Sequence, residues 1–196
     1  MLGPEPIATF DNVEDFLVWL QGQDARYELD NGRVLAMAGG TALHADIAAN
    51  ILTALRNKLK ATACRAFHGD MAVRTHRRSI RLPDVAIYCD PRDVRGDLAR
   101  RTAFEHPRVI FEVLSPSNTL NHLLEKLVEY KALPSLETIV FVHPTKRYLD
   151  VHERVSETEW RSVTHLHPAT LQLKDPALTL TPEDIFGDAD PPSEDA

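Results

Sequence analysis

Two acidic residues lie in or beside stretches whose composition otherwise predicts buried strands. Glu112 is the only charged residue of the segment 109–114, and Asp84 directly precedes the apolar run 85–89. Burying an unpaired carboxylate is costly, so a cationic partner, a metal ion or a cleft has to account for each one. Carboxylates at the ends of neighbouring strands repel one another unless a divalent cation lies between them. Oxygen ligands of this kind favour Mg²⁺ or Mn²⁺, so the pair predicts a metal site.

A second set of chemically active side chains follows at helical spacing. Lys126 and Tyr130 are one helical turn apart, and His122 precedes Lys126 by another turn. A lysine at the edge of a buried helix face can point into a cleft, where it would meet developing negative charge. Other interpretations remain open: Glu112 pairs with Lys126 in a buried salt bridge, Asp84 caps a turn, or Lys126 is a solvated helix residue.

The elements that must position these residues follow from hydrophobic periodicity and turn signals. Asn31-Gly32 predicts the tight turn of a hairpin over residues 27–36. This hairpin and the periodic segments give helix, strands, helix and strand, an order typical of a mixed α/β layer fold. We expect helices over residues 11–22, 41–60 and 118–134, strands over 65–68, 71–74, 79–82, 85–89, 109–114 and 139–142, and a closing hairpin over 148–152 and 160–164.

The remaining segments and the two cysteines carry weaker signals. Residues 90–107 alternate charges without a hydrophobic pattern, which predicts a mobile loop. Residues 187–196 are rich in acids and proline, which predicts a flexible tail after a single domain over residues 1–186. Cys64 and Cys89 are too few for a disulfide framework and match no zinc pattern. We interpret both as small buried residues in a reducing cytosol.

Charge is distributed unevenly along the chain. The 196 residues include 22 Lys and Arg against 29 Asp and Glu, a formal net charge of -7. The final 14 residues hold six of those acids and no base, so the rest of the chain has 23 acids and 22 bases. This balance argues against broad coating of nucleic acid or an anionic membrane, but not against contact at one cleft. With no secretory signal and no apolar stretch of roughly 20 residues, we expect a cytoplasmic protein without a membrane partner.

Several short motifs occur in a characteristic order between about Tyr27 and His152. In chain order they are Tyr27-Glu28-Leu29, His44 at a helix start, Gly69-Asp70-Met71, Pro83-Asp84-Val85, Phe111-Glu112-Val113-Leu114-Ser115-Pro116-Ser117, Glu125-Lys126-Leu127 and Tyr130. Together these motifs resemble the Uma-type family of restriction endonuclease-like proteins, within the PD-(D/E)XK nuclease superfamily. The resemblance implies an αβββαβ core with a mixed central sheet flanked by helices, extended by an N-terminal helix and hairpin and a C-terminal hairpin.

The resemblance also implies roles for individual residues. Asp84 and Glu112 would hold Mg²⁺ or Mn²⁺ together with the Val113 carbonyl. The superfamily lysine usually follows the second acid by two residues, where this chain has Leu114. The family pattern places the lysine on the following helix, which assigns the role to Lys126. The implied activity is metal-dependent hydrolysis of DNA phosphodiester bonds by an endonuclease.

The same resemblance implies accessory residues and one departure. Glu28 and His44 would lie near the cleft, and Tyr130 would contact the lysine or the phosphate unless it is a packing residue. Family members often have an aspartate at the position of His122, so this chain lacks a negative neighbour of the lysine. Two other functions stay open: a non-catalytic nucleic-acid or protein-binding module that keeps the nuclease fold, and a hydrolase acting on a small phosphoester.

Basic residues around Asp84 form the expected substrate surface. Between residues 74 and 108 the chain has nine bases and five acids. Arginines beside a metal cleft suit phosphate binding, whereas a solvated hairpin with internal ion pairs is an equally simple interpretation. Since many nucleases cut both strands as dimers, a homodimer is a further expectation. The arginines expected to contact DNA are Arg74, Arg77, Arg78 and Arg81.

Overall fold

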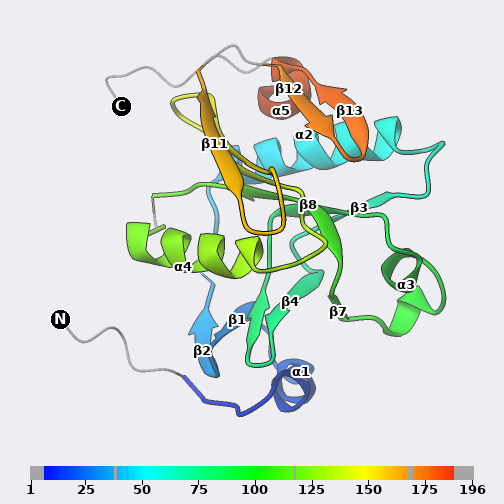
Figure 1. Cartoon of the computed structure of the whole chain (residues 1–196). Helices are drawn as coiled ribbons and strands as arrows, with labels where there is room; N and C mark the ends of the chain where they lie inside the picture. The colour runs from blue at the N-terminus through cyan, green and yellow to red at the C-terminus, as the bar shows by residue number, and fades with distance from the viewer. Residues whose placement is uncertain (1–6, 38, 117, 167–169, 188–196) are drawn as a thin grey trace.

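Two β-sheets and the helices between and beside them form the body of the protein (Figure 1). The computed structural model describes residues 7–37, 39–116, 118–166 and 170–187. The helices are α1 (Val13–Leu20), α2 (Ala42–Lys58), α3 (Pro91–Val94), the short 3-10 helix η1 (Leu98–Arg100), α4 (Leu120–Lys131) and α5 (Pro182–Phe186).

The strands fall into a six-stranded sheet, a five-stranded sheet and a separate hairpin. In spatial order the six-stranded sheet is β11 (Trp160–His165), β10 (Tyr148–Arg154), β9 (Thr138–His143), β8 (Pro107–Val113), β6 (Val85–Tyr88) and β3 (Arg65–His68). The five-stranded sheet is β2 (Arg33–Ala36), β1 (Tyr27–Asp30), β5 (Ser79–Arg81), β4 (Ala72–His76) and β7 (Ala103–Phe104). The hairpin is β12 (Leu171–Lys174) with β13 (Ala177–Leu180).

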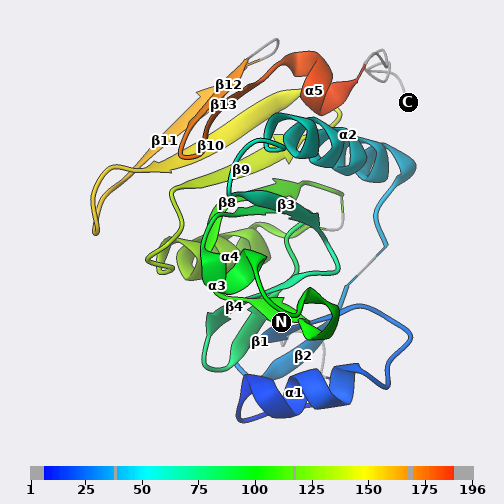
Figure 2. The same cartoon turned by 90° about the vertical axis from the view of Figure 1, so that its right-hand side faces the viewer.

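These elements stack in layers, as Figure 2 shows from the side. The β12–β13 hairpin and α5 lie above α2, and α2 covers one face of the six-stranded sheet. Helix α4 covers the opposite face, the five-stranded sheet lies beyond α4, and α1 closes the far end. Helix α4 is therefore positioned between the two sheets.

Strand β8 is buried except at the half-buried Arg108, because helices cover both faces of its sheet. It runs antiparallel to β6 and parallel to β9. Side-chain alternation directs Val109, Phe111 and Val113 into the core beneath α2. Ile110 joins the core beside α4, and Glu112 points to the same side. The alternation thus places one carboxylate among apolar side chains that face α4.

The smaller sheet begins with the predicted β1–β2 hairpin. Asn31 and Gly32 have φ angles of 45° and 86°, the positive values that a primed two-residue turn requires. Strand β1 pairs with β5 through Leu29 and Ile80, although almost fifty residues separate the two strands in the chain. Strands β4 and β5 lie between β3 and β6 in the chain but belong to the five-stranded sheet. Because β5 pairs with β1, this arrangement brings β1 next to α4.

The predicted restriction endonuclease-like core is confirmed. Helix α2, strands β3, β6 and β8, helix α4 and strand β9 follow one another in the expected αβββαβ order, within a mixed sheet flanked by helices. The N-terminal helix and hairpin and the closing β10–β11 hairpin also match the expectation. Among the described residues, no helix is both long enough and apolar enough to span a membrane.

Two segments differ from the sequence-based expectation. The segment 90–107 contains α3, η1 and β7 and buries Asp93, Val94 and Phe104, so it is ordered structure rather than a mobile loop. Its elements are too short to show hydrophobic periodicity. The β12–β13 hairpin and α5 were not predicted at all. The tail expected over residues 187–196 lies outside the described residues, apart from Gly187.

The cysteines also differ from their expected state. Cys64 and Cys89 form a disulfide and are half-buried, whereas the sequence predicted separate buried thiols. The β3–β6 register pairs Arg65 with Tyr88, so the two cysteines are the next residues across the antiparallel strands. The sequence does not show this pairing because β4 and β5 intervene between the two strands.

Candidate active site

Asp84 and Glu112 are cross-strand neighbours on the α4 side of the large sheet. The register that pairs Val85 of β6 with Phe111 of β8 continues to place Asp84 opposite Glu112. Asp84 Oδ2 accepts a hydrogen bond of 2.7 Å from the Val113 N–H. Within the described residues no hydrogen-bond donor contacts Asp84 Oδ1, and the side chain is 11% exposed. The second carboxylate oxygen is therefore available to a ligand.

Helix α4 supplies the groups that hold Glu112. Its four-residue spacing turns both Lys126 and Tyr130 toward β8. Lys126 Nζ lies 3.0 and 3.3 Å from the two Glu112 oxygens, and the Tyr130 hydroxyl donates to Glu112 Oε1 at 2.6 Å. Lys126 is 4% exposed and Tyr130 is fully buried. The predicted lysine therefore faces the predicted carboxylate from inside the protein.

Glu28 of β1 forms the opposite wall of this site and is 2% exposed. Its Oε1 lies 2.9 Å from Lys126 Nζ and accepts a 2.9 Å hydrogen bond from the Leu82 N–H. Its Oε2 lies 3.4 Å from Arg81 Nη1 and 3.5 Å from His122 Nε2. Lys126 is thus held between two carboxylates, and His122 contacts one of them.

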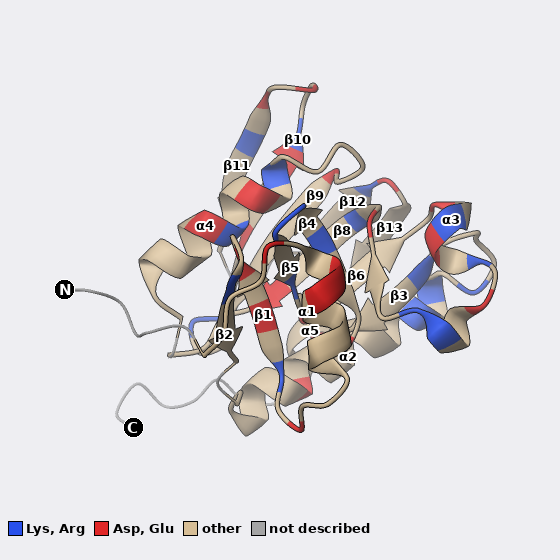
Figure 3. Cartoon of the chain, turned by 90° about the horizontal axis from the view of Figure 1, so that it is seen from below, with Lys and Arg blue, Asp and Glu red and all other residues tan. Residues whose placement is uncertain are grey.

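Arg81 of β5 is fully buried and connects three elements around Glu28. Its Nη2 lies 2.8 Å from both Asp30 Oδ1 and Glu129 Oε1, and its Nε donates to Glu129 Oε2 at 2.8 Å. Thr75 donates a further 2.6 Å hydrogen bond to Glu129 Oε2. The bidentate pairing with Glu129 joins β5 to α4, and the contacts with β1 complete the network. Acidic segments of β1 and mixed charges on α4 are visible in Figure 3. We call Glu28, Asp30, Arg81, Asp84, Glu112, Lys126 and Glu129 the charge cluster.

The cluster keeps Glu28 and Lys126 ionised despite their burial. Burial raises the pKa of Glu28, but Lys126, His122 and Arg81 together lower that pKa well below its usual range. Burial lowers the pKa of Lys126, but Glu112 and Glu28 raise it above its usual range. Lys126 is therefore a charged ammonium group at neutral pH.

Negative charge remains in excess near Asp84 and Glu112. Burial raises the pKa of Glu112, and the neighbouring carboxylates of Asp84 and Glu28 raise it further against the attraction of Lys126. The charge cluster as a whole has five carboxylates and two permanent cations. A divalent cation bound by oxygen atoms fits both this excess and the donor set.

The arrangement fits an open metal site rather than a closed one. Among the described residues, no group of three or more His, Cys, Asp and Glu side chains is arranged to hold a metal ion. Asp84 and Glu112 provide two carboxylates, and an open site takes its remaining ligands from backbone carbonyls, water or substrate.

His44 lies beside Asp84 in the first turn of α2. Thr41 caps this helix, and its side chain accepts a 3.2 Å hydrogen bond from the His44 N–H. The His44 Nε2 atom lies 3.2 Å from Asp84 Oδ2. This hydrogen bond raises the pKa of His44, while partial burial opposes the increase. The structure therefore brings both expected accessory residues, His44 and Glu28, into the site.

The four arginines predicted to contact DNA have different environments. Arg81 has no exposed surface, and its ion-pair partners among the described residues are the carboxylates of Glu28, Asp30 and Glu129. Arg74 lies within 3.2 Å of two carboxylates, and Arg78 is 3.9 Å from Asp11. Arg77 is exposed in the turn after β4 and has no ion pair within the described part of the chain.

Glu129, Asp30 and the structural role of Arg81 were missed by sequence reasoning. Glu129 follows Lys126 by three residues, so helical spacing alone could have placed both on one face of α4. Arg81 interrupts an apolar pair, Ile80 and Leu82, which is the same signal that marked Glu112. Only the pairing of β1 with β5 shows that these groups meet.

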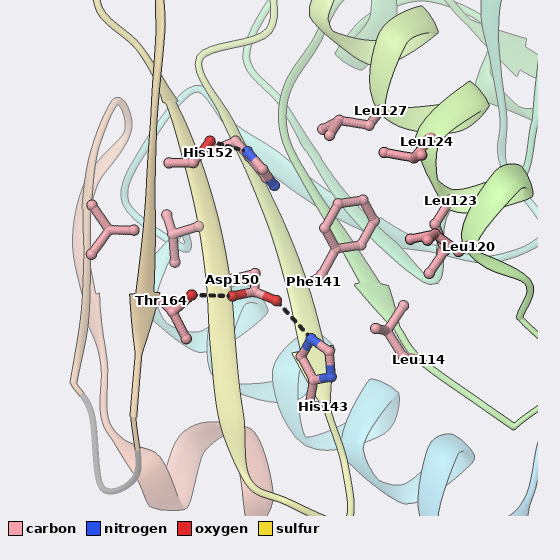
Figure 4. Close-up of a pocket in the computed structure, with 13 residues that line it drawn as sticks. Leu114, Leu120, Leu123, Leu124, Leu127, Phe141, His143, Asp150, His152 and Thr164 are labelled. Atoms are coloured by element: carbon pink, nitrogen blue, oxygen red, sulfur yellow. Dashed lines mark hydrogen bonds and ion pairs between the residues drawn. The ribbon is translucent and has the colours of Figure 1, made fainter.

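A separate pocket lies on the other side of α4, against strands β9 to β11 (Figure 4). Its volume is about 340 Å³, and four leucines of α4 form one wall. On the opposite wall His143 Nε2 lies 2.8 Å from Asp150, and Thr164 donates to Asp150 at 2.6 Å. We call this the α4 pocket, and no residue of the charge cluster lines it in the described part of the chain.

The order of elements and the mixed sheet define a protein of the restriction endonuclease-like class. Residues 13–183 match the Uma2 family, described as "Putative restriction endonuclease". The chain belongs to this family.

One protein sequence and one solved structure are similar to this chain over most of its length. An uncharacterized protein of Synechocystis sp. (strain PCC 6803), slr1290, is 27% identical over 190 residues, covering 95% of this chain and 97% of the relative. The crystal structure of a "putative nuclease belonging to DUF820" from Anabaena variabilis superposes with a TM-score of 0.70 at 17% identity. That likeness covers 89% of this chain and 97% of the other, and it shows the shared fold.

Proposed function

We propose that this protein is a Mg²⁺- or Mn²⁺-dependent endonuclease that hydrolyses phosphodiester bonds in DNA. The observation that carries the proposal is the joint burial of Glu112, Lys126 and Tyr130 beside Asp84, in a chain of a restriction endonuclease-like family. Lys126 pairs with Glu28 and Glu112. Asp84 is a further acid that Lys126 does not contact among the described residues, so pairing with the lysine does not account for it.

The proposed division of labour follows from these contacts. Asp84, Glu112 and the Val113 carbonyl would hold the metal ion. When bound, such an ion lowers the pKa of a coordinated water and polarises the phosphoryl oxygen. Tyr130 fixes the orientation of Glu112 through its hydrogen bond, and Glu28 holds Lys126 in place.

Lys126 would stabilise negative charge at the phosphate or orient the attacking water. An ammonium group has three N–H donors, and the two carboxylates of Glu28 and Glu112 occupy part of this capacity. His44 stands on the Asp84 side, where its protonated imidazole would offset part of the carboxylate charge. Arg77 stays a proposed contact to the substrate backbone.

One observation favours a second candidate function, a nuclease-fold module that binds nucleic acid or protein without cutting. Lys126 is already bound by two carboxylates and is 4% exposed, so substrate has little access to it. In such a module the charge cluster would serve stability alone.

Cleavage assays distinguish the two functions. Purified protein is incubated with supercoiled plasmid, linear duplex, single-stranded DNA and RNA, in Mg²⁺, in Mn²⁺ and in EDTA. We expect metal-dependent nicking or cutting of DNA that Asp84→Ala and Glu112→Ala abolish. Glu125→Ala is the matched control, because this exposed acid precedes Lys126 on α4 and belongs to no cluster. If both strands are cut, sedimentation with a duplex should show a homodimer.

A thermal shift measurement distinguishes the same two functions without relying on cleavage. Mg²⁺ or Mn²⁺ should raise the melting temperature of the wild type and of Glu125→Ala, but not that of Glu112→Ala. Nucleic acids left intact under every metal condition, together with unchanged melting temperatures, would favour the binding module.

A further inference from the structure

Three basic residues that pair with no carboxylate of the described residues gather at the C-terminal end of α2, away from His44. Arg56, Lys60 and Arg65 line a groove of about 350 Å³ between the end of α2 and the start of β3. No acidic residue lines this groove in the described part of the chain. We call it the basic groove, and all three of its cations are exposed.

Ion pairing separates these residues from the other cations nearby. Lys58 of α2 lies 3.2 Å from Asp184, and Arg92 lies 2.6 Å from Asp90. Within the residues that the structure describes, Arg56, Lys60 and Arg65 have no ion pair. The dipole of α2 favours cations in its last turn, but it does not account for Arg65, which belongs to β3.

The backbone beneath the groove is fixed by local bonds. The Thr62 hydroxyl donates to the Leu59 carbonyl at 2.9 Å and accepts from the Cys64 N–H at 3.1 Å. The disulfide then joins Cys64 to Cys89 at the end of β6. The connection between α2 and β3 therefore holds its cations on a preformed surface, which reduces the entropy lost on binding.

We propose that the basic groove binds the phosphodiester backbone of nucleic acid at a distance from the charge cluster. This inference rests on the proposed function and identifies a second contact for the same substrate. Arginine and lysine in a concave surface without acids suit phosphate groups, and local excess of positive charge is compatible with a net charge of -7.

The strand geometry gives the expected spacing of the two contacts. Strand β6 begins directly after Asp84, and Cys89 at its other end adjoins the groove. Five residues of extended chain span about 16 Å at roughly 3.3 Å each. A duplex rises about 3.4 Å per base pair, so a duplex that ran along β6 would meet the two contacts about five base pairs apart.

Salt-dependent binding tests this inference in an Asp84→Ala background, where cleavage cannot consume the DNA. Fluorescence anisotropy with a duplex between about 50 and 200 mM salt yields the slope of log Kd against log salt concentration. Replacing Arg56, Lys60 and Arg65 together by glutamine should reduce the magnitude of this slope by about 2.7, close to 0.9 for each phosphate contact. The control replaces Lys146, Arg161 and Lys174 by glutamine, removing the same charge from exposed positions on the β9–β13 side. The control should leave the slope unchanged.

The outcomes separate this inference from the proposed function. Equal slopes for the groove variant and the control would show that the basic groove does not bind DNA. If the wild type also cuts DNA, the proposed endonuclease activity would still hold. If the wild type cuts no nucleic acid but its DNA binding depends on the groove residues, the basic groove is a binding site and the proposed endonuclease activity is excluded. A protein that neither binds nor cuts nucleic acid would overturn both. A circular dichroism melt of the groove variant confirms that a lost slope reflects charge rather than unfolding.

Discussion

The two sides of α4 have opposite physical characters. Toward the five-stranded sheet and β8 it directs Lys126, Glu129 and Tyr130 into a network of buried, paired charges. Toward β10 and β11 it presents leucines to the α4 pocket, where Leu120 is 71% and Leu124 is 50% exposed. One helix therefore separates a closed polar site from an open apolar pocket.

This difference shows that the charged side chains held in fixed positions lie on one side of α4. In the charge cluster each buried oxygen of Glu28 has a donor, and Arg81 contacts three carboxylates. Buried charges arranged this way need no reorganisation when further charge develops next to them, which is the property that catalysis uses. Among the described residues, the polar pairs of the α4 pocket lie on its strand side. We therefore expect the chemistry on the cluster side and tolerance to change on the pocket side.

The largest expected effect comes from removing the central cation of the cluster. Arg81→Met would leave Glu28, Asp30 and Glu129 without their shared partner while keeping much of the side-chain volume. Breaking a buried ion pair typically costs about 3–5 kcal/mol, and we expect a loss of that size in the free energy of unfolding. Urea denaturation measures it, with Arg77→Met as the exposed control that should change stability by less than about 0.5 kcal/mol. A loss below about 1 kcal/mol for Arg81→Met would mean that the cluster is not a stabilising network.

Lys126→Met tests the chemistry on the cluster side. Loss of one preorganised donor of this kind typically lowers the rate by about 100- to 1,000-fold, and we expect such a decrease in plasmid nicking. Lys126→Arg keeps the charge and should retain part of the activity. A melting curve separates this effect from unfolding, and a folded Lys126→Met protein with the wild-type rate would exclude the lysine from catalysis.

Part of the polar site beside α4 could be predicted from the sequence. Asp84 and Glu112 could be found because each is a charge within an apolar strand segment, and helical spacing placed Lys126 and Tyr130 on one face. The order of the core elements followed from periodicity and from the family resemblance. These sequence patterns are local, so they can be recognised without knowing which strands pair.

Features that depend on distant pairing could not be predicted in the same way. Arg81 belongs to a run of arginines that resembles a substrate surface, but β5 pairs with β1 and turns this one side chain inward. The disulfide between Cys64 and Cys89 depends on the β3–β6 register. The burial of Arg81 and the pairing of the two cysteines both depend on β4 and β5 belonging to the five-stranded sheet rather than to the large sheet. No short segment of the sequence indicates this strand arrangement.

Removing the disulfide should have an intermediate effect. Cys64 and Cys89 are separated by 25 positions, and closing a loop of this length stabilises a protein by about 3 kcal/mol, mainly by restricting the unfolded chain. The double variant Cys64→Ser, Cys89→Ser should lose about 2–4 kcal/mol in urea denaturation. The wild type under reducing conditions should lose the same amount, and unchanged stability in both would show that the thiols are not joined in solution.

The smallest effect is expected on the pocket side of α4. Leu124→Ala shortens a side chain that is 50% exposed, so stability should change by less than about 0.5 kcal/mol and cleavage should stay at the wild-type rate. Nicking kinetics and a melting curve on the same preparation measure both quantities. A tenfold decrease in rate at unchanged stability would show that the α4 pocket takes part in the reaction, and the contrast between the two sides would fail.

Anomalous scattering of Mn²⁺ in crystals soaked at a concentration that supports cleavage tests the proposed metal site most directly. We expect one strong peak between the carboxylates of Asp84 and Glu112, with Lys126 facing the same cleft, and no peak there in Glu112→Ala crystals. An empty cleft in the wild type under those conditions, or Mn²⁺ bound only elsewhere on a protein that cuts DNA, would contradict a metal site between these two carboxylates.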